Sequence, residues 1–325
     1  MTCVINRHTM KRTESRTTPT TLPAAKREPP TKKVTPAEPS TRWGRSNRPK
    51  KGLLDRVLDK WGVTRPDAPT EAALEALHAA YLAHVPFENA TKLIKVGRAG
   101  TAGAAIRGPV EFWEEHLRWG SGGTCFSSAA AYQFLLRYAG FPSQLLFCQL
   151  PASDEDAHTA LLVTAEGRQF LVDGGYALPS TVALPDGAAV RKSTTYYDIE
   201  IRRGVEDEYL VFSEDDRGQR FRYRFMQKEV GEQAFLQSWR KTFVPKAPYM
   251  RRLALGRFRD GVRYLYKDKD PGSIFVITRA GEEARPLPTA RIPMLSKTFG
   301  LPRPLLEAAQ RALDSLVEES NRSEK

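Results

Sequence analysis

Three residues of this chain carry the side chains that covalent acyl transfer requires. Cys125 follows two glycines, His158 opens an apolar run, and Asp173 precedes two further glycines. A cysteine thiolate is a nucleophile, a neighbouring histidine accepts its proton, and a carboxylate fixes the orientation of the histidine ring. The three residues are therefore a candidate nucleophile, base and orienting group, and they define a candidate reaction class.

The surroundings of Cys125 favour this chemistry. Gly122 and Gly123 allow a tight entry into the helix that we expect to begin near Cys125 and to end at Gly140. Backbone N–H groups at a helix N-terminus carry a partial positive charge, which stabilises a thiolate. The same groups can stabilise the oxyanion that forms when a thiolate attacks a carbonyl carbon.

The spacing of His158 and Asp173 predicts that they lie on one hairpin. Residues 159–164 and 169–172 have the composition of strands, and a turn signal near Glu166 separates them. An antiparallel hairpin about residue 166 places His158 opposite residues 173–174, with Cβ atoms about 5 Å apart. Taken singly, a buried cysteine, a strand-end histidine and a turn aspartate are ordinary structural residues, so only their combination favours catalysis.

The order of the expected helices and strands along the chain predicts an α+β fold, because helices come first, strands second and a mixed segment last. We expect helices over 53–61, 70–85, 109–117, 125–138, 233–240 and 304–317, and strands over 144–150, 159–164, 169–172, 196–201, 209–212, 221–225, 263–266 and 274–277. This order divides the chain into a tail (1–51), a helical domain (52–141), a β-domain (142–228) and an α/β domain (229–325).

The net charge of +12 comes mostly from the first 51 residues, which hold 13 Lys or Arg, 3 Glu and 7 Pro. Such a segment buries too little apolar surface to offset its ordering entropy, so we expect a disordered basic tail. The tail can contact an anionic surface, whereas the nearly neutral remainder does not indicate a basic groove over a whole domain, so we expect no nucleic-acid partner for the folded part.

Three cysteines, Cys3, Cys125 and Cys148, are too few for a disulfide framework and lack metal-binding spacing. We expect no metal site, because His8, His78, His84 and His116 also lack ligand spacing. There is no apolar run of membrane-spanning length and no secretory signal, which favours a reducing cytoplasm. An organelle transit peptide is the alternative, although the scattered prolines disfavour a targeting helix.

In these motifs the chain resembles the arylamine N-acetyltransferases, from about residue 52 to about residue 313. The matching elements are Val-Pro-Phe-Glu-Asn at 85–89, Gly-Gly-Thr-Cys at 122–125, His158, and Val-Asp-Gly-Gly-Tyr at 172–176. The resemblance implies a helical bundle carrying the cysteine, an antiparallel β-barrel carrying the histidine and aspartate, and an α/β lid. It thus implies a transglutaminase-like cysteine-enzyme core.

The resemblance also implies a reaction. Acetyl-CoA, a substrate and not a bound cofactor, would acetylate Cys125, and a small arylamine or arylhydrazine would then take the acetyl group in a ping-pong cycle. His158 would be the general base and acid, and Asp173 its orienting group. Phe87 and Tyr176 match aromatic residues of the family's acceptor pocket, and we add Phe126 to this substrate-binding set.

Departures from the family pattern mark a divergent member. Ser121 stands where the family has an arginine, and Ser127 and Ala129 stand where it has a glutamate and an asparagine. Those family residues support the active-site cysteine. No glycine-rich phosphate loop is present, so Arg240 and Lys241 are our candidates for contact with the CoA phosphates.

Two other functions stay open. The triad also suits a macrolactam-forming amide synthase or a cysteine hydrolase on a similar core, although the sequence around papain-type cysteines is absent. The other possibility is a non-catalytic binding module that docks through its basic tail. The donor preference of the thiol separates the enzymatic readings, and an inert Cys125 would favour the module.

Overall fold

The computed structural model describes residues 52–99, 103–151, 157–175, 178–267 and 272–323, which belong to one compact unit. The predicted tail, with Cys3, and the candidate substrate residue Tyr176 lie outside the described residues. Among the helices that are described, none is long and apolar enough to cross a membrane.

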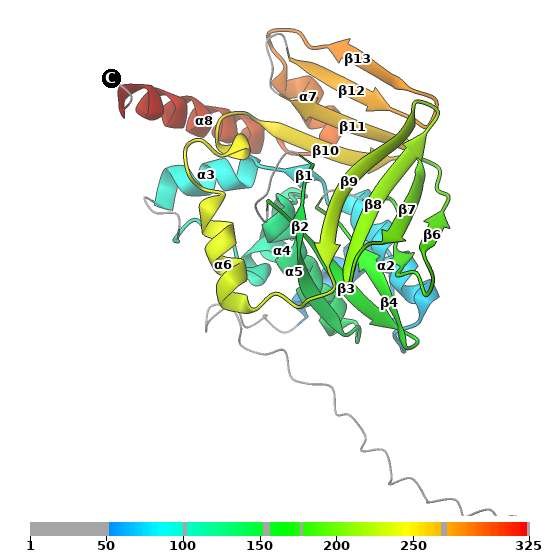
Figure 1. The fold of residues 1–325 in the computed structure, drawn as a ribbon. Coiled ribbons are helices and arrows are strands. Elements are labelled where there is room, and N and C mark those ends of the chain that lie inside the picture. Colours follow the sequence, from blue (N-terminus) through cyan, green and yellow to red (C-terminus); the bar gives the residue numbers. More distant parts are fainter. Residues whose placement is uncertain (1–51, 100–102, 152–156, 176–177, 268–271, 324–325) are drawn as a thin grey trace, which may run out of the picture. The chain divides into compact units, whose positions relative to one another are not determined.

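The first part of the unit is helical (Figure 1). Its elements are α1 (Leu53–Trp61), α2 (Glu71–His84), the short strand β1 (Phe87–Glu88), α3 (Ala90–Ala99), α4 (Pro109–Trp119) and α5 (Cys125–Tyr138). Local signals account for most of these bounds. Thr70 caps α2 by accepting a hydrogen bond from the N–H of Ala73 (3.2 Å), and left-handed Gly62 and Gly120 end α1 and α4.

Helix α3 was not expected from the sequence pattern, and its start explains why. The side chain of Glu88 accepts hydrogen bonds from the N–H (2.9 Å) and the hydroxyl (2.6 Å) of Thr91, and so replaces an ordinary Ser, Thr or Asp cap. One side of the helix packs into a core built mainly from the C-terminal part of the chain. Its stability therefore depends on tertiary contacts that the local sequence does not reveal.

The second part is an antiparallel sheet of eight strands in the order β5-β4-β3-β2-β9-β8-β7-β6, and contacts between its edge strands nearly close it into a barrel (Figure 1). The strands are β2 (Ser143–Gln149), β3 (His158–Ala165), β4 (Arg168–Val172), β5 (Val182–Ala183), β6 (Ala189–Lys192), β7 (Asp198–Arg203), β8 (Glu208–Asp215) and β9 (Gly218–Met226). The predicted α+β class with a central antiparallel barrel is confirmed.

The hairpin of β3 and β4 is tighter than expected. Ala165 pairs with Arg168 across a two-residue turn in which Glu166 and Gly167 both have positive φ (48° and 76°). The last paired residues are Leu161 and Val172. Continuing this register would bring His158 level with residue 175 rather than 173–174, so Asp173 reaches the histidine diagonally.

The last part combines helices with a five-stranded antiparallel sheet in the order β1-β10-β11-β12-β13. Its elements are α6 (Glu232–Lys241), a 3₁₀ turn (Pro248–Met250), β10 (Ala254–Arg259), β11 (Val262–Lys267), β12 (Ser273–Ile277), β13 (Glu282–Pro286), α7 (Ile292–Phe299) and α8 (Arg303–Ser323). Strand β1 pairs with β10, and Phe87 also bridges to Gly123. This short strand therefore links the loop before Cys125 to the C-terminal sheet.

Candidate active site

Cys125 is the first residue of α5 and is 8% exposed. The N-cap residue Thr124 is extended (φ −81°, ψ 170°) and makes no side-chain capping bond. Its side chain therefore leaves the first-turn N–H groups of α5 available to a thiolate or an oxyanion. This is the position that the sequence predicted for the nucleophile.

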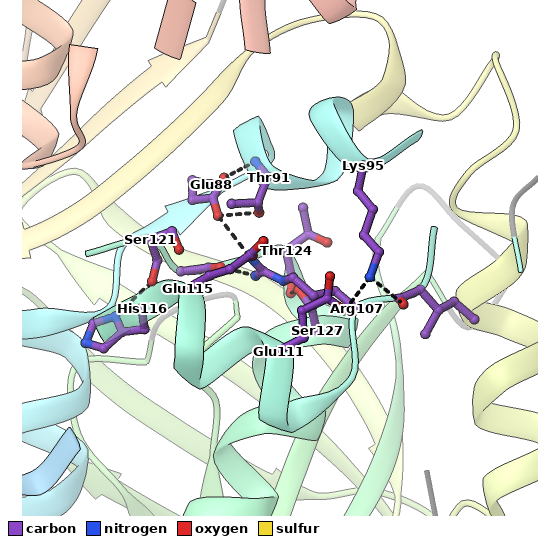
Figure 2. A network of polar contacts seen from close by, with 12 residues as sticks. Glu88, Thr91, Lys95, Arg107, Glu111, Glu115, His116, Ser121, Thr124 and Ser127 are labelled. Carbon is purple, nitrogen blue, oxygen red and sulfur yellow. Dashed lines mark hydrogen bonds and ion pairs between the residues drawn. The ribbon is translucent and has the colours of Figure 1, made fainter. Parts of the chain in front are cut away.

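The four residues before Cys125 are held through their carbonyl groups, and Figure 2 shows the contact between His116 and Ser121. His116 Nδ1 donates to the carbonyl of Ser121 (2.8 Å), and Arg107 Nη2 donates to that of Gly122. The carbonyl of Gly123 accepts two hydrogen bonds, from the N–H of Glu88 (3.2 Å) and from the hydroxyl of Ser128 (3.2 Å). The hydroxyl of Ser127 donates to the carbonyl of Thr124 (3.0 Å). Each carbonyl of the loop thus has a donor, so the loop presents Cys125 in one defined conformation.

His116 acts in this loop as a neutral hydrogen-bond donor. Burial lowers its pKa to about 4, so the ring is uncharged at neutral pH. Trp61 Nε1 donates to its Nε2 atom (3.0 Å), which assigns the ring proton to Nδ1, the atom facing the carbonyl of Ser121. The sequence pattern did not indicate this structural role.

His158 and Asp173 meet as the hairpin predicted. His158 Nε2 lies 2.7 Å from Asp173 Oδ2, and the two residues are 3% and 1% exposed. The other carboxylate oxygen accepts the N–H of Gly175 (2.9 Å). The contact with Asp173 leaves Nδ1 as the imidazole nitrogen that can serve Cys125.

The charge of this pair is set by competing effects. Burial lowers the pKa of His158, but the negative charge and hydrogen bond of Asp173, with smaller contributions from Cys125, raise it to about 10. His158 is therefore an imidazolium at neutral pH. An imidazolium beside a cysteine stabilises the thiolate form, which is the nucleophile.

Gly175 brings the helical and barrel halves of the site together. A Cβ atom at this position would lie 2.7 Å from Cys125 Cα, 2.8 Å from Cys125 Cβ and 3.5 Å from His158 Cε1. The loop after Asp173 thus approaches the start of α5 so closely that no side chain fits between them. Gly122 is constrained in a similar way, because its Cβ would lie 1.7 Å from Pro86 O.

A buried lysine adds a second cation near the thiol. Lys92 Nζ donates to the carbonyl (2.6 Å) and the hydroxyl (2.9 Å) of Thr242, and it lies 4.6 Å from the ring centre of Phe243. Burial lowers the pKa of Lys92 to about 8, and the negative charge of Cys125 opposes that shift. No motif around Lys92 pointed to this placement.

The three predicted substrate residues differ in their surroundings. The ring of Phe87 is half-buried beside Tyr249 (5.4 Å between ring centres) and lines a cleft of about 310 Å³. Phe126 is enclosed by Phe235 (5.2 Å) and Trp239 (6.3 Å). Substrate contacts by Phe87 and Phe126 stay predictions, as does one by Tyr176, which lies outside the described residues.

The cleft runs beside Gly174 and Gly175 and is rich in arginine. Its lining includes Arg217, Arg220, Arg222, Arg252, Arg257 and Arg263, with Asp215 and Glu282 as the acidic residues. Arg217 contacts both of these carboxylates, at 2.6 and 3.1 Å. The cleft consequently retains an excess of positive charge that favours an anionic ligand.

The sequence analysis missed this arginine cleft, because its members come from the turn before β9, from β9, β10 and β11, and from the segment before β10. The alternating arginines of β9 were the one available signal. Arg240 and Lys241 lie in the last turn of α6, where they are exposed and do not belong to the cleft lining described above. Contact between these two residues and CoA phosphates stays a prediction.

Three further features concern possible metal ligands and the buried residues Cys148 and His78. Among the residues that the structure describes, no three His, Cys, Asp or Glu side chains form a metal-binding group. Cys148 is fully buried in the core of the barrel. His78 Nε2 lies 2.7 Å from the carbonyl of Leu178, in a fully buried setting.

Comparisons with known proteins give one family and one fold. A family model described as N-acetyltransferase matches residues 71–269. No curated protein sequence matches the chain. Among solved structures, the arylamine N-acetyltransferase from Salmonella typhimurium has 19% identity and a TM-score of 0.67, covering 82% of this chain and all (100%) of that one.

Two further solved structures are similar in fold. The arylamine N-acetyltransferase from M. tuberculosis has 20% identity and a TM-score of 0.69 over 80% of this chain and 99% of that one. The Mycobacterium marinum enzyme in complex with CoA has 20% identity and a TM-score of 0.65, over 81% and 99% of the two chains. At these identities the similarity of structure establishes the fold.

The Gly175→Ala variant tests the close approach of the two halves. We expect it to lower the free energy of unfolding by about 1–3 kcal/mol, because the added methyl group overlaps Cys125. Alkylation of Cys125 by iodoacetamide, followed by peptide mass spectrometry, should slow by at least about 10-fold because the thiol and His158 are forced apart. Gly187→Ala is the control, since nothing lies within 4 Å of its added Cβ. Equal alkylation rates would contradict the constraint.

The raised pKa of His158 predicts a pH-dependent contribution to stability. The folded protein keeps a proton on His158 up to about pH 10, whereas the unfolded chain releases it near 6.5. The stabilisation is therefore complete below about pH 6.5 and is lost as the pH rises through about 10. In urea unfolding, the stability difference between the wild type and His158→Gln should shrink over this range.

The control for the pH experiment is His84→Gln. Burial lowers the pKa of His84, so its contribution does not fall as the pH rises above 6.5. A stability difference for His158→Gln that stays constant or grows toward pH 10 would show that the histidine is neutral in the folded protein.

Proposed function

Because the chain belongs to the arylamine N-acetyltransferase family of acyltransferases, we propose that it transfers acetyl from acetyl-CoA to arylamines or arylhydrazines. The transfer proceeds through an acetyl-Cys125 intermediate. The observation that carries this proposal is the meeting of Cys125, at the start of α5, with a His158 that Asp173 holds at 2.7 Å. The family match supports the donor and acceptor classes.

In the first half-reaction, the thiolate of Cys125 attacks the thioester carbonyl carbon of acetyl-CoA. A new C–S bond forms, and first-turn N–H groups of α5 stabilise the oxyanion of the tetrahedral intermediate. The bond to the sulfur of CoA then breaks. The imidazolium of His158 gives its proton to the leaving thiolate, so CoA departs as a thiol and His158 becomes neutral.

In the second half-reaction, the amine nitrogen attacks the acetyl carbon on Cys125. Neutral His158 accepts a proton from the nitrogen, the bond from carbon to Sγ breaks, and the thiolate–imidazolium pair returns. Asp173 holds the ring and stabilises its positive charge in both half-reactions. The protonated resting state of His158 thus suits an enzyme whose first product is a thiol.

The cleft supports both substrates. Its excess of arginine favours a donor that carries phosphate groups, since guanidinium groups bind phosphate oxygens in a planar fork. Phe87 and Tyr249 present aromatic surfaces near Gly175, and aromatic amines pack well against such rings. Donor and acceptor would enter by this cleft in turn, as a ping-pong cycle requires.

An assay of CoA release tests the proposed reaction. With acetyl-CoA and anisidine, we expect sustained release of free CoA thiol, and without the amine a burst of about one equivalent per enzyme. Cys125→Ala should lower the rate by at least about 1,000-fold because no covalent intermediate can form. Cys148→Ala is the matched control, since its thiol is buried in the barrel core.

Other results would redirect the proposal. No release from acetyl-CoA, together with rapid alkylation of Cys125, would reject this donor and favour an amide synthase or a hydrolase. No release together with an inert Cys125 would favour a binding module.

A second prediction concerns the phosphates of the donor. Among the residues described, Arg252 has no ion pair or side-chain hydrogen bond, and its Nε atom is buried without a partner. Arg252→Gln should raise the KM for acetyl-CoA by about 5- to 50-fold, because a charged hydrogen bond is lost. It should leave the KM for the phosphate-free donor S-acetyl-N-acetylcysteamine within about twofold.

Arg240→Gln is the control for this experiment, because Arg240 is exposed at the end of α6. Equal increases in KM for both donors would place Arg252 outside phosphate recognition. An effect of Arg240→Gln confined to acetyl-CoA would move the phosphate site to α6.

A further inference from the structure

Glu88 is a buried acid that needs a nearby cation. It is 0% exposed, and its two carboxylate oxygens accept hydrogen bonds from Thr91. Burial raises the pKa of Glu88, and the charge of Arg107 opposes that shift. Arg107 Nη1 lies 4.0 Å from Glu88 Oε1, and this is the one ion pair of Glu88 within the described part of the chain.

Arg107 reaches three elements from this buried position (Figure 2). Beside Glu88 of β1, it pairs with Glu115 of α4 through Nη1 (2.7 Å), and its Nη2 atom donates to the carbonyl of Gly122. Its guanidinium lies 4.6 Å from the ring centre of Phe112, and the residue is 5% exposed. One planar cation thus joins two carboxylates and the loop before Cys125.

Ser121 and Ser127 lie at positions where the chain departs from the motif of the family it resembles. The resemblance drawn in the sequence analysis implies an arginine at the position of Ser121, directly before the two glycines. Here the hydroxyl of Ser121 is buried without a hydrogen-bond partner among the described residues. A Cβ on Gly123 would lie 2.2 Å from the hydroxyl of Ser127 and 2.8 Å from Arg107 Nη2, so these two groups fill the space around the loop.

We infer that Arg107 supplies, from a different place in the sequence, the positive charge that position 121 lacks, and that it is the positioning residue of Cys125. It acts through the carbonyl of Gly122, three residues before the nucleophile. It also acts through Glu88, whose neighbour Phe87 bridges to Gly123 and lines the cleft. For the acetyl-transfer readout, this inference rests on the proposed function.

Two substitutions separate positioning from stability. Arg107→Lys keeps the charge but loses the planar fork that holds Glu115 and Gly122 together. We expect it to reduce kcat for acetyl transfer by about 10- to 100-fold, with the KM for the amine within about threefold, because a misplaced nucleophile slows chemistry more than binding. Alkylation of Cys125 should slow by a similar factor.

The double variant Glu88→Gln/Arg107→Met removes both buried charges together. Relative to Arg107→Met alone it should recover most of the lost thermal stability, because no fully buried carboxylate is left without a cation, whereas the side chain of Glu115 is 32% exposed to solvent. Its kcat and its alkylation rate should stay at least about 10-fold below the wild type, since the carbonyl of Gly122 still lacks its donor. Arg118→Gln is the matched control, because Arg118 is an exposed α4 residue that also lies over an aromatic ring, 4.4 Å from the centre of Trp119.

Two outcomes would overturn the inference: wild-type kcat and alkylation in Arg107→Lys, or recovery of both rates along with stability in the double variant. Either would make Arg107 a residue of stability alone. Alkylation needs no acetyl-CoA, so it tests Arg107 even where the wild type fails to release CoA. Failure of the proposed function is therefore distinguishable from failure of this inference.

Discussion

The site depends on the contact between the backbone of Gly175 and the start of α5. Because a Cβ at this position would lie 2.7 Å from Cys125 Cα, the barrel loop and the helix meet with no side chain between them. The N–H of Gly175 is bound to Asp173, which in turn holds His158. The absence of a side chain at Gly175 therefore allows the close packing that fixes the relative positions of the thiol, the imidazole and the carboxylate.

Electrostatics then assign different states to neighbouring buried groups. Beside the thiol, Asp173 outweighs the effect of burial and keeps His158 charged. Behind the loop, His116 has no carboxylate partner among the described contacts, so burial keeps it neutral and a hydrogen-bond donor to Ser121. Arg107 meanwhile offsets the buried charge of Glu88. The two histidines show that charge here follows from the partner and not from burial alone.

The sequence could predict what depends on local pattern. The helix from Cys125 to Tyr138, the hairpin that joins His158 to Asp173, and the α+β order all followed from periodicity, glycines and turn signals. Elements that form through distant pairing escaped prediction. Strand β1 has two residues and exists because β10 lies beside it, and α3 begins on the side chain of Glu88. The hairpin register shifted because its turn is set by positive φ at Glu166 and Gly167.

The same distinction explains why Arg107 carries no signature of its own. A sequence motif describes residue types at fixed positions along the chain. A buried carboxylate needs only a cation close to it in the folded protein, wherever that cation lies in the sequence. Position 107 lies at the start of the segment leading into α4, and the fold returns it to the loop at 122. Arg107 thus reaches this loop from 14 residues before Ser121, through its hydrogen bond to the carbonyl of Gly122. A buried carboxylate can therefore be paired by a cation that no motif beside the nucleophile records, because the requirement is one of place in the fold and not of position in the sequence.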